Sequence, residues 1–177
     1  WAAAGSSTWS DNMAGRKMVE RRPLIAVCGA GSADAESAGK AYETGRLLAR
    51  AGAVLICGGL GGIMSAAAKG AKEEGGLTIG LLPGAKHSDA NSYIDLPLPT
   101  GLGHARNAVI ASSAQAIIAL PGGPGTLSEI SLGLKMERPV IGLGAWFDIE
   151  GVRSAKTPEQ AVALALKALG PERGTTG

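Results

Sequence analysis

The chain alternates between short apolar runs and longer stretches in which apolar residues recur at helical spacing. Uninterrupted apolar runs of five or six residues are typical of strands that are covered on both faces, as in a parallel sheet. A weaker segment, "YIDLPLP" at residues 93–99, predicts a further strand or an extended connection. Five runs predict buried strands, at residues 24–28, 53–57, 77–82, 115–120 and 139–144.

Helical patterns separate these runs, at residues 36–51, 61–74, 103–113 and 125–136, and a last helix is expected from Thr157 onward. There Thr157 suits the N-cap, Pro158 the first helical position and Gln160 the third position of a capping box. The regular alternation of strand and helix predicts an α/β fold with a single Rossmann-like, doubly wound parallel sheet flanked by helices.

A chain of 177 residues has the length of one ordinary domain. We expect residues 21–170 to form a single Rossmann-like nucleotide-binding domain and residues 171–177 to be a flexible tail. Residues 1–20 are interpreted as a tag or a flexible extension, since the opening "WAAAGSSTWSDN" has neither the charged start nor the apolar stretch of a signal peptide.

The formal net charge is only +2, and the basic residues are scattered, which argues against nucleic-acid and membrane partners. Binding of single-stranded DNA would also require a basic groove and aromatic platforms, and neither is apparent. No apolar run approaches the ~20 residues that a membrane-spanning helix needs. Cys28 and Cys57 are interpreted as buried, reduced thiols, with a disulfide as the alternative. These features predict a cytoplasmic protein.

Glycine-rich loops follow three of the predicted strands, and the carboxyl ends of such strands are where doubly wound sheets bind ligands. The loops are "CGAGSAD" at residues 28–34, "CGGLGGIMS" at residues 57–65 and "PGGPGT" at residues 121–126. The first loop departs from a dinucleotide fingerprint because Asp34 stands in place of its third glycine, and no acidic residue ends the second strand. A classical NAD site is therefore not expected.

The first two loops each have two interpretations. Gly29 and Gly31 either form a tight turn or contact a ligand. The second loop either packs its helix closely or faces a ligand, and four glycines in five positions exceed what one turn needs, which favours the ligand. These four are Gly58, Gly59, Gly61 and Gly62.

The third loop is the most specific of the three. Its glycines open a helix, where free backbone N–H groups and the positive end of the helix dipole bind phosphate. Glu129 would then lie beside the bound group, although Thr126 and Glu129 also have the spacing of a capping box. Arg106 is predicted to open another helix at the same edge, where a cation opposes the dipole, and this suggests a role with an anion or carboxylate.

These motifs resemble the Lonely Guy family, cytokinin-activating phosphoribohydrolases that were once misnamed lysine decarboxylases. The likeness is closer to the small bacterial branch of unassigned function and to the algal molybdenum-cofactor carrier proteins, and it covers about residues 22–145. The family hallmark is P-G-G-x-G-T-x-x-E preceded by an Arg-Lys pair, and "PGGPGTLSE" matches it up to Glu129, with Arg106 at the arginine position. "GGLGGIM", ending at Met64, resembles the family's other glycine loop.

The resemblance implies catalytic roles for Arg106 and Glu129. It departs from the family at three positions, since Asn107 replaces a lysine, Pro124 an aromatic residue and Ser128 the first of two glutamates. The residues expected to bind phosphate or nucleotide are Gly29, Gly31, Gly58, Gly59, Gly61, Met64, Asn107, Gly122, Gly123, Gly125 and Thr126.

Two functions are compatible with these features. The first is hydrolysis of the N-glycosidic bond of a nucleoside 5′-monophosphate to free base and ribose 5-phosphate, with Glu129 stabilising an oxocarbenium-like state. The alternative is a carrier or sensor that binds a phosphorylated cofactor, such as molybdopterin, or a signalling nucleotide without turnover. No cofactor or metal ion is expected to be required, and the resemblance implies a homodimer or homotetramer. Lysine decarboxylation is rejected, because no lysine is placed to hold pyridoxal phosphate.

Overall fold

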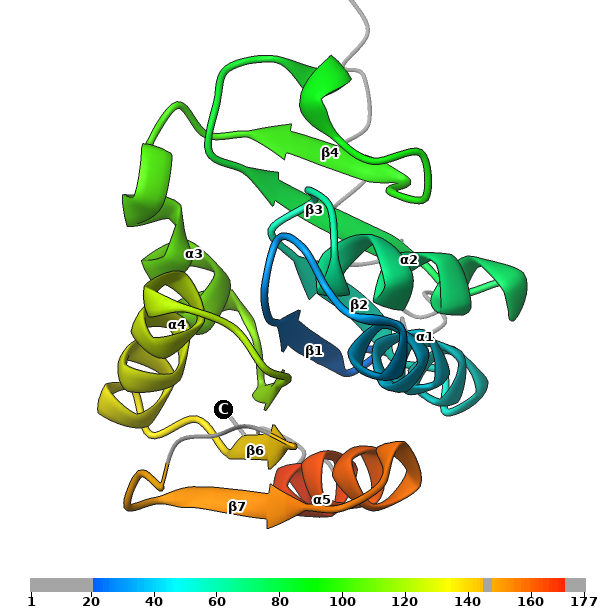
Figure 1. Cartoon of the computed structure of the whole chain (residues 1–177), viewed down its shortest axis with the longest axis vertical. Helices are drawn as coiled ribbons and strands as arrows, with labels where there is room; N and C mark the ends of the chain where they lie inside the picture. The colour runs from blue at the N-terminus through cyan, green and yellow to red at the C-terminus, as the bar shows by residue number, and fades with distance from the viewer. Residues whose placement is uncertain (1–20, 145–147, 171–177) are drawn as a thin grey trace, which may run out of the picture.

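The computed structural model describes residues 21–144 and 148–170, which are built around a seven-stranded parallel sheet (Figure 1). The strand order is β4-β3-β2-β1-β5-β6-β7, so the chain starts in the middle, winds to one edge and then returns to build the other half. The strands are β1 (Leu24–Cys28), β2 (Val54–Cys57), β3 (Thr78–Leu82), β4 (Leu96–Pro99), β5 (Ala116–Ala119), β6 (Val140–Leu143) and β7 (Val152–Ala155).

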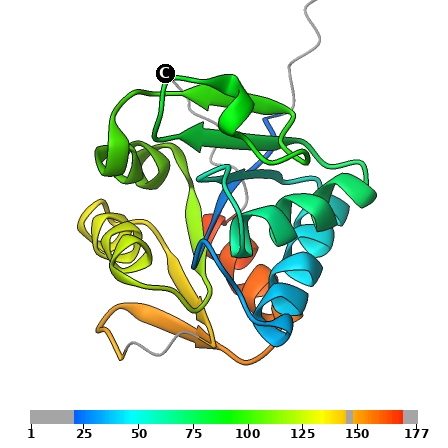
Figure 2. The same cartoon turned by 45° about the horizontal axis from the view of Figure 1, so that its top comes forward.

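Helices cover both faces of the sheet, with α1, α2 and α5 on one side and α3 and α4 on the other (Figures 1 and 2). This arrangement confirms the predicted doubly wound α/β fold. The helices are α1 (Ala35–Arg50), α2 (Ile63–Glu73), α3 (Arg106–Ser113), α4 (Pro124–Lys135) and α5 (Pro158–Leu169), with short 3-10 turns η1 (His87–Asp89) and η2 (Gly103–Ala105).

The two faces explain why the strands are apolar at every position. In β1, Ile25 and Val27 join the core under α1, α2 and α5, whereas Ala26 and Cys28 join the core under α3 and α4. Successive side chains of a strand point to opposite faces, so a strand covered on both sides has no position left for a polar residue.

The five apolar runs correspond to β1, β2, β3, β5 and β6, as predicted, and "YIDLPLP" contains β4. Strand β7 was not predicted, because it lies at the sheet edge, where Arg153 and Ser154 are exposed and only Ala155 is buried. The last helix starts as predicted, with Pro158 in the first turn and the Thr157 hydroxyl accepting from the amide of Gln160. The expectations for residues 1–20 and 171–177 lie outside the described residues.

The interface between α1 and α2 depends on two glycines. A Cβ at Gly45 would lie 1.9 Å from the carbonyl oxygen of Ala67, and a Cβ at Gly70 would lie 2.0 Å from the carbonyl oxygen of Tyr42. The Ala- and Gly-rich composition of α2 therefore serves close helix packing.

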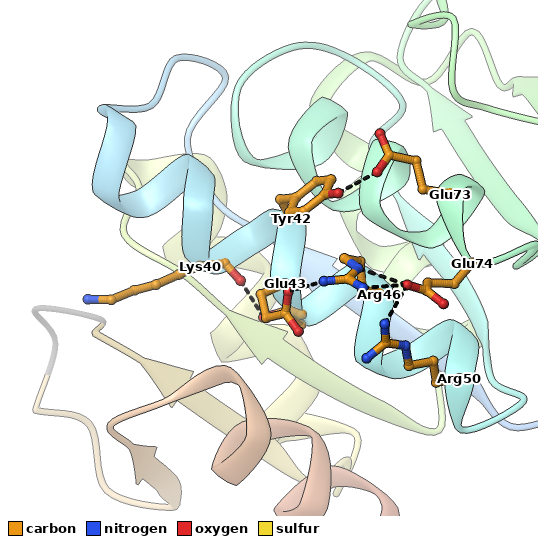
Figure 3. A network of polar contacts seen from close by, with 8 residues as sticks. Lys40, Tyr42, Glu43, Arg46, Arg50, Glu73 and Glu74 are labelled. Atoms are coloured by element: carbon orange, nitrogen blue, oxygen red, sulfur yellow. Dashed lines mark hydrogen bonds and ion pairs between the residues drawn. The ribbon is translucent and has the colours of Figure 1, made fainter.

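A polar network spans the outer side of this interface (Figure 3). Arg46 and Arg50 of α1 each place a guanidinium nitrogen 2.7 Å from Oε1 of Glu74, at the end of α2. These two guanidinium groups, Arg50 first, hold the pKa of Glu74 at about 2. Tyr42 also donates its hydroxyl proton to Glu73.

The two cysteines are free thiols, as predicted. Register explains why they are not paired: Ala26 of β1 lies opposite Ile56 of β2, so Cys28 and Cys57 are offset by one residue and point to opposite faces. Burial raises the pKa of Cys57 to about 12 and raises the pKa of Cys28 well above its ordinary value. Within the described ranges, no helix has both the length and the apolar character to cross a membrane.

Candidate functional site

The three glycine-rich loops meet at the carboxyl edge of the sheet. Ala30, in the loop after β1, donates its amide to the carbonyl of Pro121 in the loop after β5, at 3.0 Å. The carbonyl of Ala30 accepts the amide of Ile63, at the start of α2, also at 3.0 Å. Backbone hydrogen bonds thus hold the loops after β1, β2 and β5 together as one surface.

Some of the predicted ligand-binding glycines are explained by this packing. A Cβ at Gly29 would lie 2.7 Å from the side chain of Ile63, and one at Gly122 would lie 2.1 Å from Oγ1 of Thr126. Gly61 is also close to another loop, since its Cβ would lie 3.1 Å from the carbonyl oxygen of Gly31. For these positions the packing interpretation is sufficient by itself.

Other glycines border open space. Apart from chain neighbours and the backbone of the same helix, no atom of the described residues lies within 4 Å of a Cβ built at Gly31, Gly123 or Gly125. Gly123, Pro124 and Gly125 are also exposed, so the start of α4 faces solvent. Gly59, in contrast, has φ of +73° and turns the backbone between β2 and α2, where its Cβ would meet the side chain of Leu82.

The N-terminus of α4 has no side-chain cap. Gly123 is the N-cap residue and Pro124 occupies the first turn, so Thr126 and Glu129 both lie inside the helix and are buried. The capping-box alternative for Thr126 and Glu129 is therefore wrong. Within the described part of the chain, the amides of Gly125 and Thr126 donate to no protein acceptor; Gly125 is exposed, whereas Thr126 is buried beneath the helix start.

Arg106 and Glu129 come together beneath this helix start. Arg106 is the first residue of α3, positioned by the preceding turn η2, and its Nη1 lies 3.5 Å from Oε1 of Glu129. Both side chains are about nine-tenths buried. The Nε of Arg106 is buried and has no hydrogen-bond partner among the described residues. A buried guanidinium with an unused donor is unusual, and it points to a missing partner.

Gly58 makes room for this arginine. A Cβ at Gly58 would lie 2.4 Å from Nη2 of Arg106 and 2.7 Å from Sδ of Met64. The second glycine loop therefore contributes to the site in an unexpected way, because one of its glycines accommodates a side chain rather than a ligand. Met64, buried in the first turn of α2, packs beside the same arginine position.

Asn107 makes its hydrogen bonds within the protein. Its Oδ1 accepts from Nη1 of Arg106 at 2.6 Å, and its Nδ2 donates to Oγ of Ser128 at 2.7 Å and to the carbonyl of Gly125 at 3.3 Å. Ser128 in turn donates to the carbonyl of Gly125 at 2.7 Å. A neutral Asn–Ser pair thus joins α3 to α4 at the two positions where the resembling family has charged residues.

Burial dominates the electrostatics of Glu129. It raises the pKa of this carboxyl to about 7, against the lowering effects of the Arg106 charge and of a hydrogen bond with the Cys28 thiol. Sequence reasoning missed the contact between Cys28 and Glu129, because nothing in a strand-end cysteine indicates which helix residue will lie over it. Among the described residues, no group of three or more His, Cys, Asp or Glu side chains is placed to hold a metal ion.

Comparison with known proteins identifies the relatives of this chain. An uncharacterized protein of Archaeoglobus fulgidus is 48% identical over 138 residues, which cover 78% of this chain and 91% of that protein. The molybdenum cofactor binding protein of Rippkaea orientalis is 36% identical, with a TM-score of 0.81, and the match covers 85% of this chain and 99% of that one. The molybdenum cofactor carrier protein of Chlamydomonas reinhardtii is also 36% identical, with a TM-score of 0.78 and coverage of 85% and 100%.

The resemblance inferred from the glycine motifs is confirmed at the level of the superfamily, while a specific place among the Lonely Guy hydrolases is not. The family model that matches is described as the SLOG cluster4 family, and the match runs over residues 22–169. The chain therefore belongs to the SLOG cluster4 family, within the Lonely Guy-like superfamily.

Proposed function

We propose that the protein binds a phosphorylated cofactor of the molybdenum-cofactor type and carries it without chemical turnover. The observation that carries this proposal is the uncapped, exposed N-terminus of α4, whose Gly125 and Thr126 amides have no protein acceptor within the described ranges. Two structures that match most of this chain are of proteins that bind or carry the molybdenum cofactor, which supports the same class of ligand.

The side chains around the helix start suit a phosphate group. Arg106 supplies one buried positive charge with an unused Nε donor, and the open surface at Gly123 and Gly125 lets a ligand approach the backbone. Pro124 gives this approach an apolar rim, but it lacks the flat face on which a nucleotide base would stack. The site therefore favours recognition through the phosphate over recognition through a purine.

Hydrolysis of a nucleoside 5′-monophosphate is the second candidate, and the Arg106–Glu129 pair favours it. A carboxylate can stabilise an oxocarbenium-like state, but a protonated carboxyl loses that ability. Since burial raises the pKa of Glu129 to about 7, any such hydrolysis should become faster as the pH rises through about 7.

The decisive experiment measures binding and turnover on the same preparation. Purified protein is incubated anaerobically with molybdenum cofactor, and the retained cofactor is quantified after rapid gel filtration. In parallel, a panel of nucleoside monophosphates is assayed for released base by chromatography. We expect stoichiometric retention of the cofactor and no base release. Base release that increases through pH 7 and is lost in Glu129→Gln would establish the hydrolase instead.

A matched pair of variants tests the position of the phosphate. Gly125→Asp and Gly125→Asn add side chains of nearly equal size at a position where a Cβ meets no atom within 4 Å. The carboxylate should repel a phosphate at the helix start, so Asp should weaken cofactor binding at least about tenfold more than Asn, or ~1.4 kcal/mol. Equal affinities for the two variants would place the phosphate elsewhere.

A further inference from the structure

We infer that Glu129 couples the binding of a phosphate group at this site to the uptake of one proton. Where Glu129 is ionised in the free protein, its carboxylate pairs with Arg106, and in the complex a protonated Glu129 leaves the charge of Arg106 to the ligand. The inference rests on the proposed phosphate site and adds a condition to it.

The Arg106 guanidinium can contact both the Glu129 carboxylate and a bound ligand. Arg106 and Glu129 are the only charged residues that are buried in the described part of the chain, so each is the other's principal electrostatic partner. Their closest atoms are 3.5 Å apart, beyond the usual range of a strong charge-assisted hydrogen bond. The Nε of Arg106 has no hydrogen-bond partner among the described residues, and Nη2 lies 2.4 Å from where a Cβ at Gly58 would be. The guanidinium is thus incompletely used by the carboxylate.

A dianion changes the balance of charge. With Glu129 ionised, the buried side-chain charges cancel, and an arriving phosphate meets only the partial positive charge of the α4 N-terminus. With Glu129 protonated, the same phosphate meets a full positive charge in a region of low dielectric. Binding of a dianion therefore favours the protonated carboxyl, and by thermodynamic linkage protonation favours binding.

Among the titratable groups near Glu129, Glu129 itself is the one expected to gain or lose a proton near neutral pH. Cys28 of β1, on the α4 side of the sheet, has a thiol pKa raised well above its ordinary value by burial, and burial raises the pKa of Cys57, on the other side, to about 12. Burial raises the pKa of Glu129 itself to about 7, so the proton is gained or lost near neutral pH. Oδ1 of Asn107 accepts from Nη1 of Arg106 at 2.6 Å, and this hydrogen bond does not require a charge on Glu129, so it can keep the guanidinium in place when Glu129 is protonated.

His104 is the neighbouring group that could mimic this behaviour. It is exposed in η2, two residues before Arg106, and histidine is the side chain to exclude first when binding depends on pH near neutrality. A test must therefore separate the two residues by substitution.

Inorganic sulfate is a suitable probe, because it mimics a phosphate group but remains a dianion from pH 5.5 to 8.5, so any proton taken up belongs to the protein. The dissociation constant is measured across this range from the NMR shifts of the Gly125 and Thr126 amides, with chloride keeping the ionic strength constant. We expect the sulfate Kd to be nearly constant below about pH 6.5 and to rise about tenfold per pH unit above about pH 7.5. Sulfate should also raise the midpoint of the Glu129 carboxyl carbon titration.

Three variants complete the experiment. Glu129→Gln should bind sulfate with a Kd that no longer rises at high pH, whereas His104→Gln and the exposed-site control Glu36→Gln should retain the wild-type profile. A pH-independent Kd in the wild type, or a profile abolished by His104→Gln alone, overturns the inference and leaves the phosphate site intact. No shift of the α4 amides with sulfate at any pH overturns both.

Discussion

At the scale of single residues, the lack of a side chain at Gly58 shapes the site as much as the side chains around it do. Gly58 occupies the place where a Cβ would press on Arg106, at 2.4 Å from Nη2. The conformation of Gly58 does not itself require glycine, since its φ lies outside the left-handed range. Substitution should therefore move the arginine without breaking the turn.

We accordingly expect Gly58→Ala to fold normally and to bind sulfate about tenfold more weakly, or ~1.4 kcal/mol, because the guanidinium is displaced from the ligand. Sulfate titration of the α4 amides measures the affinity, and urea unfolding measures the stability. Gly39→Ala, on the open face of α1, is the control and should leave the affinity unchanged. Wild-type affinity in Gly58→Ala would mean that Arg106 does not reach the ligand.

The residues of the site were predicted unevenly from sequence. Arg106 and Glu129 were found through the family pattern, and the structure brings them together. The roles of Asn107 and Gly58 were not found, because both depend on contacts between segments far apart in the chain: Asn107 bonds to Ser128, and Gly58 borders Arg106. Apolar patterns and short motifs describe local structure and carry no information on such side-chain geometry.

At the scale of elements, replacing a helical glycine by alanine has two opposite effects on stability. It raises helix propensity, but it destabilises the protein where the new Cβ overlaps a neighbouring helix. Ala is a better helix former than Gly by about 1 kcal/mol, so Gly39→Ala in α1, where the new Cβ meets no atom within 4 Å, should stabilise the protein by up to that amount. Gly70→Ala in α2 should instead destabilise it by roughly 1–3 kcal/mol, because the Cβ would overlap the carbonyl oxygen of Tyr42.

Chemical unfolding of the two variants gives the comparison directly. If Gly70→Ala were as stable as Gly39→Ala, the α1–α2 interface would be looser than the structure shows. The Ala and Gly content of α2 is visible in the sequence, but it does not identify α1 as the packing partner. It also missed β7, because an edge strand with one solvent-facing side lacks the continuous apolar run that revealed the central strands.

At the scale of the whole molecule, the buried carboxyl of Glu129 should make stability depend on pH in an unusual direction. Its pKa is raised in the folded protein to about 7 from an ordinary value of 4.5, foremost by burial. Between these two pH values the folded state keeps a proton that the unfolded chain has lost. The contribution is therefore fully present below about pH 4.5 and is lost as the pH rises to about 7.

The network around Glu74 has the opposite sign and a separate pH window. The two arginines hold its pKa at about 2, so its contribution is present above pH 4.5 and is lost as the pH falls toward 2. Of these two carboxyl groups, only Glu129 changes the stability of the protein near neutral pH. A shift from 4.5 to about 7 corresponds to a loss of about 3 kcal/mol in the free energy of unfolding between pH 4.5 and 7.5.

Urea unfolding at half-unit pH intervals should show this decline in the wild type. In Glu129→Gln the same interval should be nearly flat, because the amide carries no proton to lose, while Glu36→Gln should reproduce the wild-type slope. Saturating sulfate provides a further check, since a ligand that binds the protonated form should stabilise the fold more at pH 6 than at pH 8. A flat wild-type profile would show that the Glu129 carboxyl is ionised throughout this range, with Arg106 compensating its burial. The free protein would then hold no proton on Glu129 near neutral pH, contrary to the coupling proposed above.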